Sequence, residues 1–313
     1  MLRYTIKRLL ATIPVMGVVA LFVFSLLYLS PGDPAVVIAG DLATNDDIIR
    51  IRASLGLDQP FLVRFGGWVW DLAHGDLGIS IFTNLPVSTL IMQRVEPTIA
   101  LTICTLIVTV GIAVPLGVVA AWKAESWIDR SVMGLSVIGF SVPVFVLAYI
   151  LVMVFSLWLD WLPVQGYRSI FDGLWPFLQH MILPSVALSL VYIALIARIT
   201  RASMLDVLAQ DYIRTAQAKG LAPGAVLIRH ALKNAAVPVV TIIGIGIALL
   251  ISGVVVTETV FAIPGVGRLT VDAILRRDYP IIQGVILLFS AAYVLVNLLV
   301  DLSYTLFDPR IRY

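Results

Sequence analysis

Residues 198–238 read RITRASMLDVLAQDYIRTAQAKGLAPGAVLIRHALKNAAVP, the longest polar interruption in the second half of the chain. Lys219 stands where a cation suits the last turn of a helix, and Gly220 supplies the left-handed residue that ends it. Before this turn, apolar side chains recur at three- and four-residue steps and predict one helical stripe of Leu205, Leu208, Tyr212 and Ala216. The stretch is therefore predicted to fold as a helical loop.

A second helix is predicted to begin at Pro223, where the missing N–H of proline costs nothing. Its apolar stripe consists of Ile228, Leu232 and Ala235. Arg229 and Lys233 form a basic stripe beside it. Two short helices joined by a tight glycine turn make a compact knob, which can lay one face into a groove on another protein.

The composition predicts that lipid surrounds much of the chain. Of the 313 residues, 60% are hydrophobic and 13% are charged, and the mean hydropathy is +1.01. A soluble domain of this size has no core large enough for so many apolar side chains. The single cysteine, Cys104, permits neither an intramolecular disulfide nor a cysteine zinc cluster. The basic N-terminus and the long apolar run after it predict an uncleaved membrane anchor.

Uncharged runs long enough to cross a bilayer, about 20 residues of helix, predict an all-α membrane protein with six transmembrane helices. The runs are 9–30, 98–122, 131–159, 181–197, 235–257 and 281–300. Pro143 is predicted to kink the third run, and Pro184 to give the fourth run an interrupted or tilted entry.

Lysine and arginine predict the orientation. With the N-terminus inside, the outer segments hold eight of the 21 Lys and Arg residues, and the inner segments hold the other thirteen. The outer eight are Arg50, Arg52, Arg64, Arg94, Arg168, Arg268, Arg276 and Arg277. Because cations are enriched on the cytoplasmic side, both termini and the 198–238 loop are predicted to be cytoplasmic.

Residues 31–97 are predicted to form a small extracytoplasmic segment between the first two spans. A short helix is expected at 46–55, ended by Gly56. Phe65, Trp68 and Trp70 are expected to cluster at the membrane interface. The predicted division is an N-terminal tail with the first helix (1–30), the extracytoplasmic segment (31–97) and a core of five transmembrane helices (98–313).

Eight short motifs, in order along the whole chain, resemble the integral-membrane permeases of ABC importers in the dipeptide, oligopeptide and nickel branch. They are PGDP at 31–34, LGLDQP at 55–60, DLGIS at 76–80, TAQAKG at 215–220, RHALKNA at 229–235, ETVFAIPGVGRL at 258–269, RDYP at 277–280 and DPRIR at 308–312. The resemblance implies the type I permease fold of ABC importers. It also implies a cytoplasmic loop, the EAA loop, that docks on an ATPase subunit.

In the family's loop motif, two small residues precede a glycine by a fixed gap. Thr215 and Ala216 stand at the small positions, Gly220 is the glycine, and Arg214 stands where other branches carry Glu. The closing proline, Pro238, falls later than in the general pattern. The ATPase-docking residues implied are Asp211, Tyr212, Arg214, Thr215, Ala216, Lys219, Gly220, Arg229 and His230. Alanine at 216 is expected to let a partner's backbone come close.

The resemblance implies a pore subunit of an ATP-driven importer in a bacterial or archaeal cytoplasmic membrane. The solute is expected to be a dipeptide or oligopeptide, with nickel or another small solute as the alternative. The expected partners are a second, homologous permease in a heterodimer, two cytoplasmic ABC ATPases coupled through residues 206–236, and an extracytoplasmic solute-binding protein. No GxxxxGK[ST] phosphate loop occurs in the sequence, so the chain is not expected to be an enzyme. ATP and Mg²⁺ belong to the partner subunits, and no cofactor is expected here.

Other interpretations make different predictions. The 198–238 loop could be an ordinary cationic loop, and helix–turn–helix spacing suits DNA, although tethering to the bilayer at both ends argues against nucleic acid. A secondary transporter driven by an ion gradient would need paired broken helices and midplane ion ligands, which the sequence does not show clearly. A non-transporting assembly or sensor subunit is the remaining alternative.

Several single residues have structural interpretations that outweigh functional ones. His74 with Asp71 and Asp76 is expected to be a polar loop cluster rather than a metal site. Asp301 is expected to pair with Arg310 or Arg312, and Glu258 to shape the outer bend together with Arg268. Glycines in the second and fifth spans are expected to allow close helix packing: Gly111, Gly117, Gly244, Gly246 and Gly253.

Overall fold

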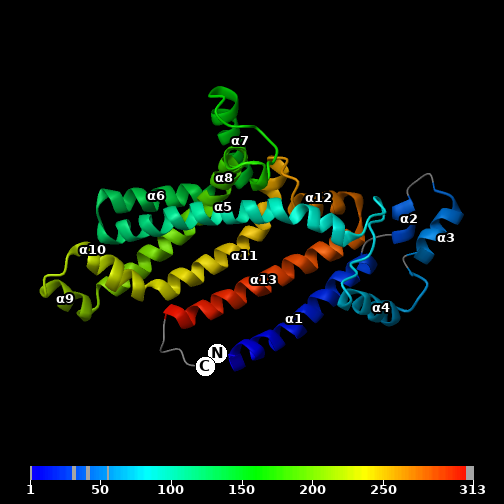
Figure 1. Ribbon diagram of the computed structural model, residues 1–313, viewed down its shortest axis with the longest axis horizontal. Helices are drawn as coiled ribbons and strands as arrows, with labels where there is room; N and C mark the ends of the chain where they lie inside the picture. Colours follow the sequence, from blue (N-terminus) through cyan, green and yellow to red (C-terminus); the bar gives the residue numbers. More distant parts are fainter. Residues whose placement is uncertain (1, 30–32, 40–42, 55, 308–313) are drawn as a thin grey trace. The chain divides into compact units, whose positions relative to one another are not determined.

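The computed structural model describes residues 2–29, 33–39, 43–54 and 56–307, and Figure 1 follows the chain through them. In these ranges the regular structure is helical, with one isolated antiparallel bridge between Ile79 and Pro86. The motif at 308–312, the first two residues of the motif at 31–34, and the proposed partners of Asp301 lie outside the described residues. The chain divides into two compact units, Val95–Arg268 with Leu295–Tyr313, and Leu2–Arg94 with Leu269–Val294.

In the part of the chain that the structure describes, four helices are long and apolar enough to cross a membrane. They are α1 (Leu2–Leu29), α5 (Val87–Trp122), α8 (Leu174–Leu208) and α13 (Tyr279–Phe307). Two further candidates are bent pairs, which raise the number to six if each pair is one span. One pair joins α6 (Trp127–Ser141) to α7 (Val144–Leu151) and the π-helix η1 (Val152–Trp158); the other joins α10 (Pro223–Ala225) and the π-helix η3 (Val226–Leu232) to α11 (Ala236–Val260).

The two prolines predicted to disturb helices behave differently. Between α6 and α7 the chain turns by 101°, because Val142 before the proline and Pro143 itself are extended. The expected kink is therefore a complete break. Pro184 instead lies inside the continuous helix α8, so the expected interruption is wrong. Its neighbours Leu183 and Ser185 are buried, and their packing lets the helix continue past the hydrogen bond that the proline cannot make.

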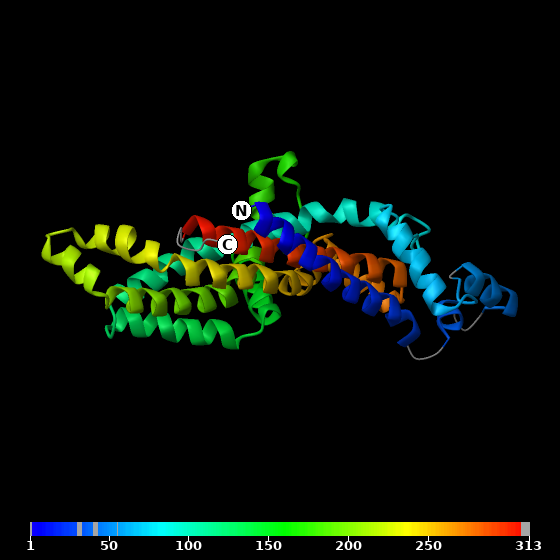
Figure 2. The same ribbon diagram turned by 90° about the horizontal axis from the view of Figure 1, so that it is seen from below.

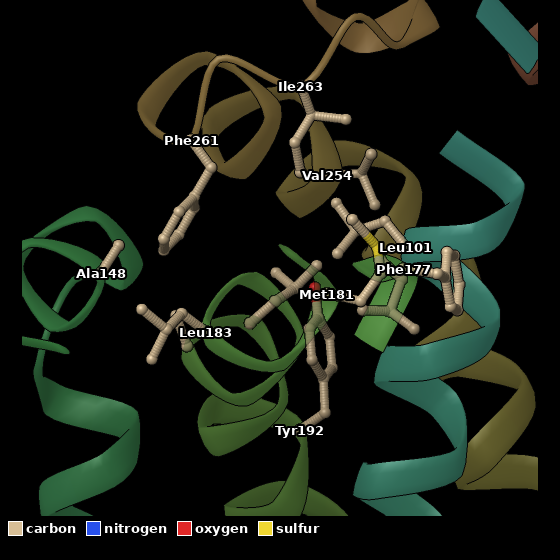
Figure 3. Close-up of a cluster of buried hydrophobic side chains, with 12 residues drawn as sticks. Leu101, Ala148, Phe177, Met181, Leu183, Tyr192, Val254, Phe261 and Ile263 are labelled. Carbon is tan, nitrogen blue, oxygen red and sulfur yellow. The ribbon is translucent and has the colours of Figure 1, made fainter. Parts of the chain in front are cut away.

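The larger unit has an apolar core between α5, α7, α8 and α11. Figure 3 shows Leu101 of α5, Val254 of α11 and Met181 of α8 converging on the middle of this core. Close backbone approach supports the packing: a Cβ at Gly117 would lie 2.7 Å from the Ala197 carbonyl oxygen. Gly244 and Gly253 have equally tight neighbours, whereas Gly111 has no atom within 4 Å, so the prediction of close packing fails at Gly111.

A buried carboxylate organises the bend after α11. Glu258 is 0% exposed, and its carboxylate accepts hydrogen bonds from the Thr98 hydroxyl at 2.6 Å and from the Arg268 backbone N–H at 2.9 Å. The bond to Arg268 lies in the first turn of α12 (Val266–Arg276), where a helix has free N–H groups and partial positive charge. Glu258 therefore shapes the bend with Arg268 as expected, but through the backbone of Arg268.

The smaller unit contains the predicted helix after the first span. It is α3 (Asn45–Ser54), which ends before Gly56 at φ +61°. Thr44 and Asp47 close the start of α3: the Thr44 hydroxyl lies 2.6 Å from the Asp47 carboxylate, and each side chain accepts the other's backbone N–H. These bonds from Thr44 lower the pKa of Asp47, so the cap is present at neutral pH and is lost as the carboxyl protonates in acid.

Aromatic packing joins α1 to α4 (Phe61–Ala73) in the same unit, which also contains the short α2 (Pro34–Ala39). The Phe24 ring lies 5.4 Å from Phe65 and 5.3 Å from Trp68, measured between centroids. Trp70 does not join them, because it is 68% exposed and its ring contacts that of His74 in a tilted arrangement. The predicted cluster therefore contains Phe65 and Trp68 but not Trp70.

Two motifs that are far apart in the sequence meet in the smaller unit. The Asp278 carboxylate is 2% exposed and accepts hydrogen bonds from the Ser80 hydroxyl at 2.5 Å and the Ile81 N–H at 3.4 Å. Gly78 lies against Pro280, where an added Cβ would meet the proline ring at 3.8 Å. The DLGIS and RDYP segments thus fix the entry into α5 against the entry into α13.

We expect Gly265→Ala to destabilise the larger unit. The added Cβ would lie 2.1–2.4 Å from the Glu258 carboxylate atoms, so the carboxylate must leave the N-terminus of α12. Unmaking a buried hydrogen bond of this kind costs about 1–3 kcal/mol. The measurement is the thermal unfolding midpoint of the purified protein in detergent, and Gly111→Ala is the matched control. Equal midpoints for the two variants would contradict the role of Glu258.

Candidate functional site

The loop between α8 and α11 is folded, as the sequence predicts. Figures 1 and 2 both show α9 (Asp211–Ala218) and the segment after it at the end of α8 and α11. Gly220 has φ +78°, and the N–H of Leu221 returns to the Ala216 carbonyl at 3.3 Å to close the turn. Pro223 opens α10 at its first turn. The predicted glycine turn and the proline start are both confirmed.

In the predicted apolar stripe before the turn, Leu205 and Leu208 pack against buried apolar side chains and Ala216 is buried, so the prediction is wrong only at Tyr212. Helix α8 ends at Leu208, and Gln210 is extended, so α9 begins with a new helical phase. Because the phase is reset, Ile213 at 0% exposure faces the interior, while Tyr212 is 44% exposed.

In the stripe predicted after the turn, Ala235 is buried and Leu232 packs against the same buried side chains, so the prediction is wrong only at Ile228. Residues 226–232 form the π-helix η3, whose turns contain more residues than those of an α-helix. The inward side chains are therefore Val226, Leu227 and Ala231, and Ile228 is 68% exposed. Arg229 and Lys233 are exposed, as the basic stripe requires.

An apolar cluster fastens the loop to the neighbouring helices. Its buried members come from α5, α8, α9, η3 and the residue before α11: Ala121, Met204, Ile213, Val226, Leu227, Ala231 and Ala235. The loop is therefore one packed body with the ends of α5 and α8, and it continues into α11 without an unstructured linker.

An ion pair lies beside this cluster. The guanidinium of Arg201, on α8, donates to both oxygens of Asp129, on α6, at 2.5 and 2.6 Å. Asp129 is 3% exposed and also accepts the Glu125 backbone N–H at 2.9 Å. Sequence analysis missed this pair. The Ser126-to-Asp129 spacing is a helix-start signal, and the Ser126 hydroxyl does cap α6, but nothing local identifies the partner 72 residues away.

The predicted docking residues divide into an outer and an inner set. The exposed members are Asp211, Tyr212, Arg214, Thr215, Lys219, Gly220 and Arg229. Arg214 and Asp211 form an exposed ion pair at 3.5 Å, and His230 is half-buried. Ala216 is 9% exposed, so it cannot receive another protein's backbone as expected. Its small side chain serves the internal packing of the loop.

The other candidate residues have local partners. The His74 ring nitrogen Nδ1 lies 2.8 Å from the Trp70 carbonyl oxygen, and Asp76 accepts the Gly78 N–H at 2.8 Å. His180 Nδ1 lies 2.7 Å from the Pro176 carbonyl oxygen. A pocket of about 420 Å³ beside α7 is lined by side chains without charge, namely Leu151, Phe155, Trp161, Leu162, Trp175, Ile182, Leu183 and Val186.

Comparison with known proteins finds relatives that match this chain over almost its whole length. Residues 113–313 match the family model "Binding-protein-dependent transport system inner membrane component", and residues 1–102 match the model of its N-terminal part. A probable peptide ABC transporter permease of Sinorhizobium fredii is 56% identical over 310 residues, which covers 99% of each chain. The glutathione transport system permease GsiC of Escherichia coli is 44% identical over 313 residues, covering 100% of both.

A solved structure shares the fold. The MetNI methionine ABC transporter, in inward-facing conformations, matches with a TM-score of 0.60 at 17% identity, and the match covers 71% of this chain and 97% of the other. The chain therefore belongs to the binding-protein-dependent transport system inner membrane component family, the integral-membrane permeases of ABC importers.

Proposed function

We propose that this permease subunit imports short peptides. The observation that carries the proposal is full-length similarity to relatives named for peptide and glutathione transport, 56% and 44% identical. Both relatives are covered from end to end, so the comparison includes the parts that a solute would meet. In this proposal the chain forms one half of the pore, and a second, homologous permease forms the other half. An extracytoplasmic binding protein delivers the peptide to this pore.

The chain takes its energy from two ATPase subunits that grip the loop at 206–236. Three features support this assignment: the loop is folded, its outer face carries Arg214, Lys219 and Arg229, and its inner face packs on α5 and α8. A rigid knob transmits displacement, whereas a flexible loop would absorb it. Nucleotide binding on the ATPases would then tilt α8 and α11 and bias the pore between two states.

The orientation that suits this role places the loop and both termini in the cytoplasm. Each bent helix pair then counts as one span, giving six, and residues 31–97 lie outside. The distribution of lysine and arginine favours this orientation.

Uptake assays test the solute. A deletion strain complemented with this chain and its partner subunits is expected to regain uptake of labelled di- and tripeptides. Nickel uptake in the same strain is the comparison. Restored nickel uptake without peptide uptake would contradict the proposed solute and leave the importer assignment intact.

We expect Gly220→Val to abolish co-purification of the ATPase subunits while membrane insertion stays normal. The site has free space, but the φ of +78° excludes a β-branched residue, so the turn must change shape. Gly66→Val is the matched control, because that glycine on α4 also has no neighbour within 4 Å and has an ordinary φ. Undiminished co-purification with Gly220→Val would count against docking at this loop.

Thiol labelling is expected to confirm the orientation. With Cys104 replaced by serine, single cysteines are placed at the exposed positions Asp46 and Asp211. A membrane-impermeant reagent should label position 46 in intact cells, and position 211 only after the membrane is opened. The reverse pattern would overturn the topology.

A further inference from the structure

The Asp129–Arg201 pair connects the docking loop, through α8, to α6. Helix α6 is not adjacent to that loop in the sequence. Arg201 lies one turn before Met204 and Leu205 on α8, and both of these belong to the apolar cluster under the loop. Asp129 lies in the first turn of α6. The α5–α6 turn is thus attached to the loop body at two points, through Ala121 in the cluster and through the ion pair.

The contact has the geometry of an orienting clamp. A guanidinium that donates to both carboxylate oxygens fixes direction as well as distance. The third bond, from the Glu125 N–H, depends on a turn in which Glu125 has φ +65°. A buried ion pair is weak evidence for stability, because desolvation offsets most of the attraction. Fixed orientation between two helices is what the geometry specifies.

Helix α6 continues from this clamp to the break in the chain. It ends at Ser141, where the path turns by 101° into α7, and Ala148 of α7 is buried in the core against α8. A displacement of the loop that tilts α8 would therefore move the near end of α6 through the clamp. The hinge at 142–143 would take up the resulting change in direction.

We infer that Asp129 and Arg201 are positioning residues that carry the movement of the docking loop to α6. The inference rests on the proposed function, since it requires the ATPases to drive the loop. The pair touches neither solute nor nucleotide in this role. It makes α6 and its hinge part of the moving body, together with α8 and α11.

The test separates attachment of the ATPases from use of their energy. The complete importer, with the partner permease, ATPases and binding protein, is reconstituted in lipid vesicles with Asp129→Asn, Arg201→Gln, the double variant or Arg201→Lys. Three quantities are measured: ATPase subunits retained on purification, ATP hydrolysed, and dipeptide transported per ATP. Arg198→Gln, an exposed arginine one turn earlier on α8, is the matched control.

Each single variant is expected to retain its ATPases but to transport roughly tenfold fewer dipeptides per ATP. The double variant should lose no more than either single variant, because the same contact is removed in each case. Arg201→Lys should recover part of the ratio, since it keeps the charge but not the two-pronged contact. Arg198→Gln should match the unaltered importer.

Two results would overturn the inference. One is an unchanged number of dipeptides per ATP in both Asp129→Asn and Arg201→Gln. The other is a parallel loss of ATPase retention, hydrolysis and transport in all four variants including Arg201→Lys, which would make the pair a folding contact only. Failure of the proposed function has a different signature, because the unaltered importer itself would then retain no ATPase subunits or transport no dipeptide.

Discussion

A charged group buried in the protein loses its hydrogen bonds to water, and this constraint explains how the chain holds its buried carboxylates. Glu258, Asp129 and Asp278 are each at most 3% exposed, and each accepts hydrogen bonds from the protein. Glu258 lies near the end of α11, but its carboxylate accepts an N–H from the first turn of α12, and Asp129 lies in the first turn of α6. At a helix N-terminus, free N–H groups and the helix dipole favour negative charge. Charge is thus used to hold helix ends in place.

Apolar packing and a buried ion pair fix the loop between α8 and α11 to the neighbouring helices. Its inner face is apolar and packs on Met204 and Ala121, while its cations remain outside. A loop tied only by its two chain ends would move independently of the helices. Packing on α5 and α8, together with the Asp129–Arg201 contact, converts it into an extension of the membrane helices.

Local rules predicted local features well. Gly220 and Gly56 have the positive φ that their turns need, and Pro223 opens a helix, because these preferences belong to single residues. Helical phase was predicted only in part, since most of the residues expected to face inward do so but Tyr212 and Ile228 are exposed. The break at Gln210 and the π-helix at 226–232 change which side chains face inward, so Ile213 is buried and Ile228 is exposed. Likewise, helix α8 continues through Pro184 because the neighbouring residues are buried. The local sequence does not show that these residues are buried.

The amino-acid sequence alone determined the membrane class, the site of the folded loop and the family, because hydropathy, turn residues and motif order are properties of contiguous segments. Tertiary structure decided which face of the loop is inward and which charges meet. Arg201 finds Asp129 across 72 residues, and Ser80 finds Asp278 across 198. Such pairings depend on how helices pack side by side, and packing depends on the shape of every neighbour at once.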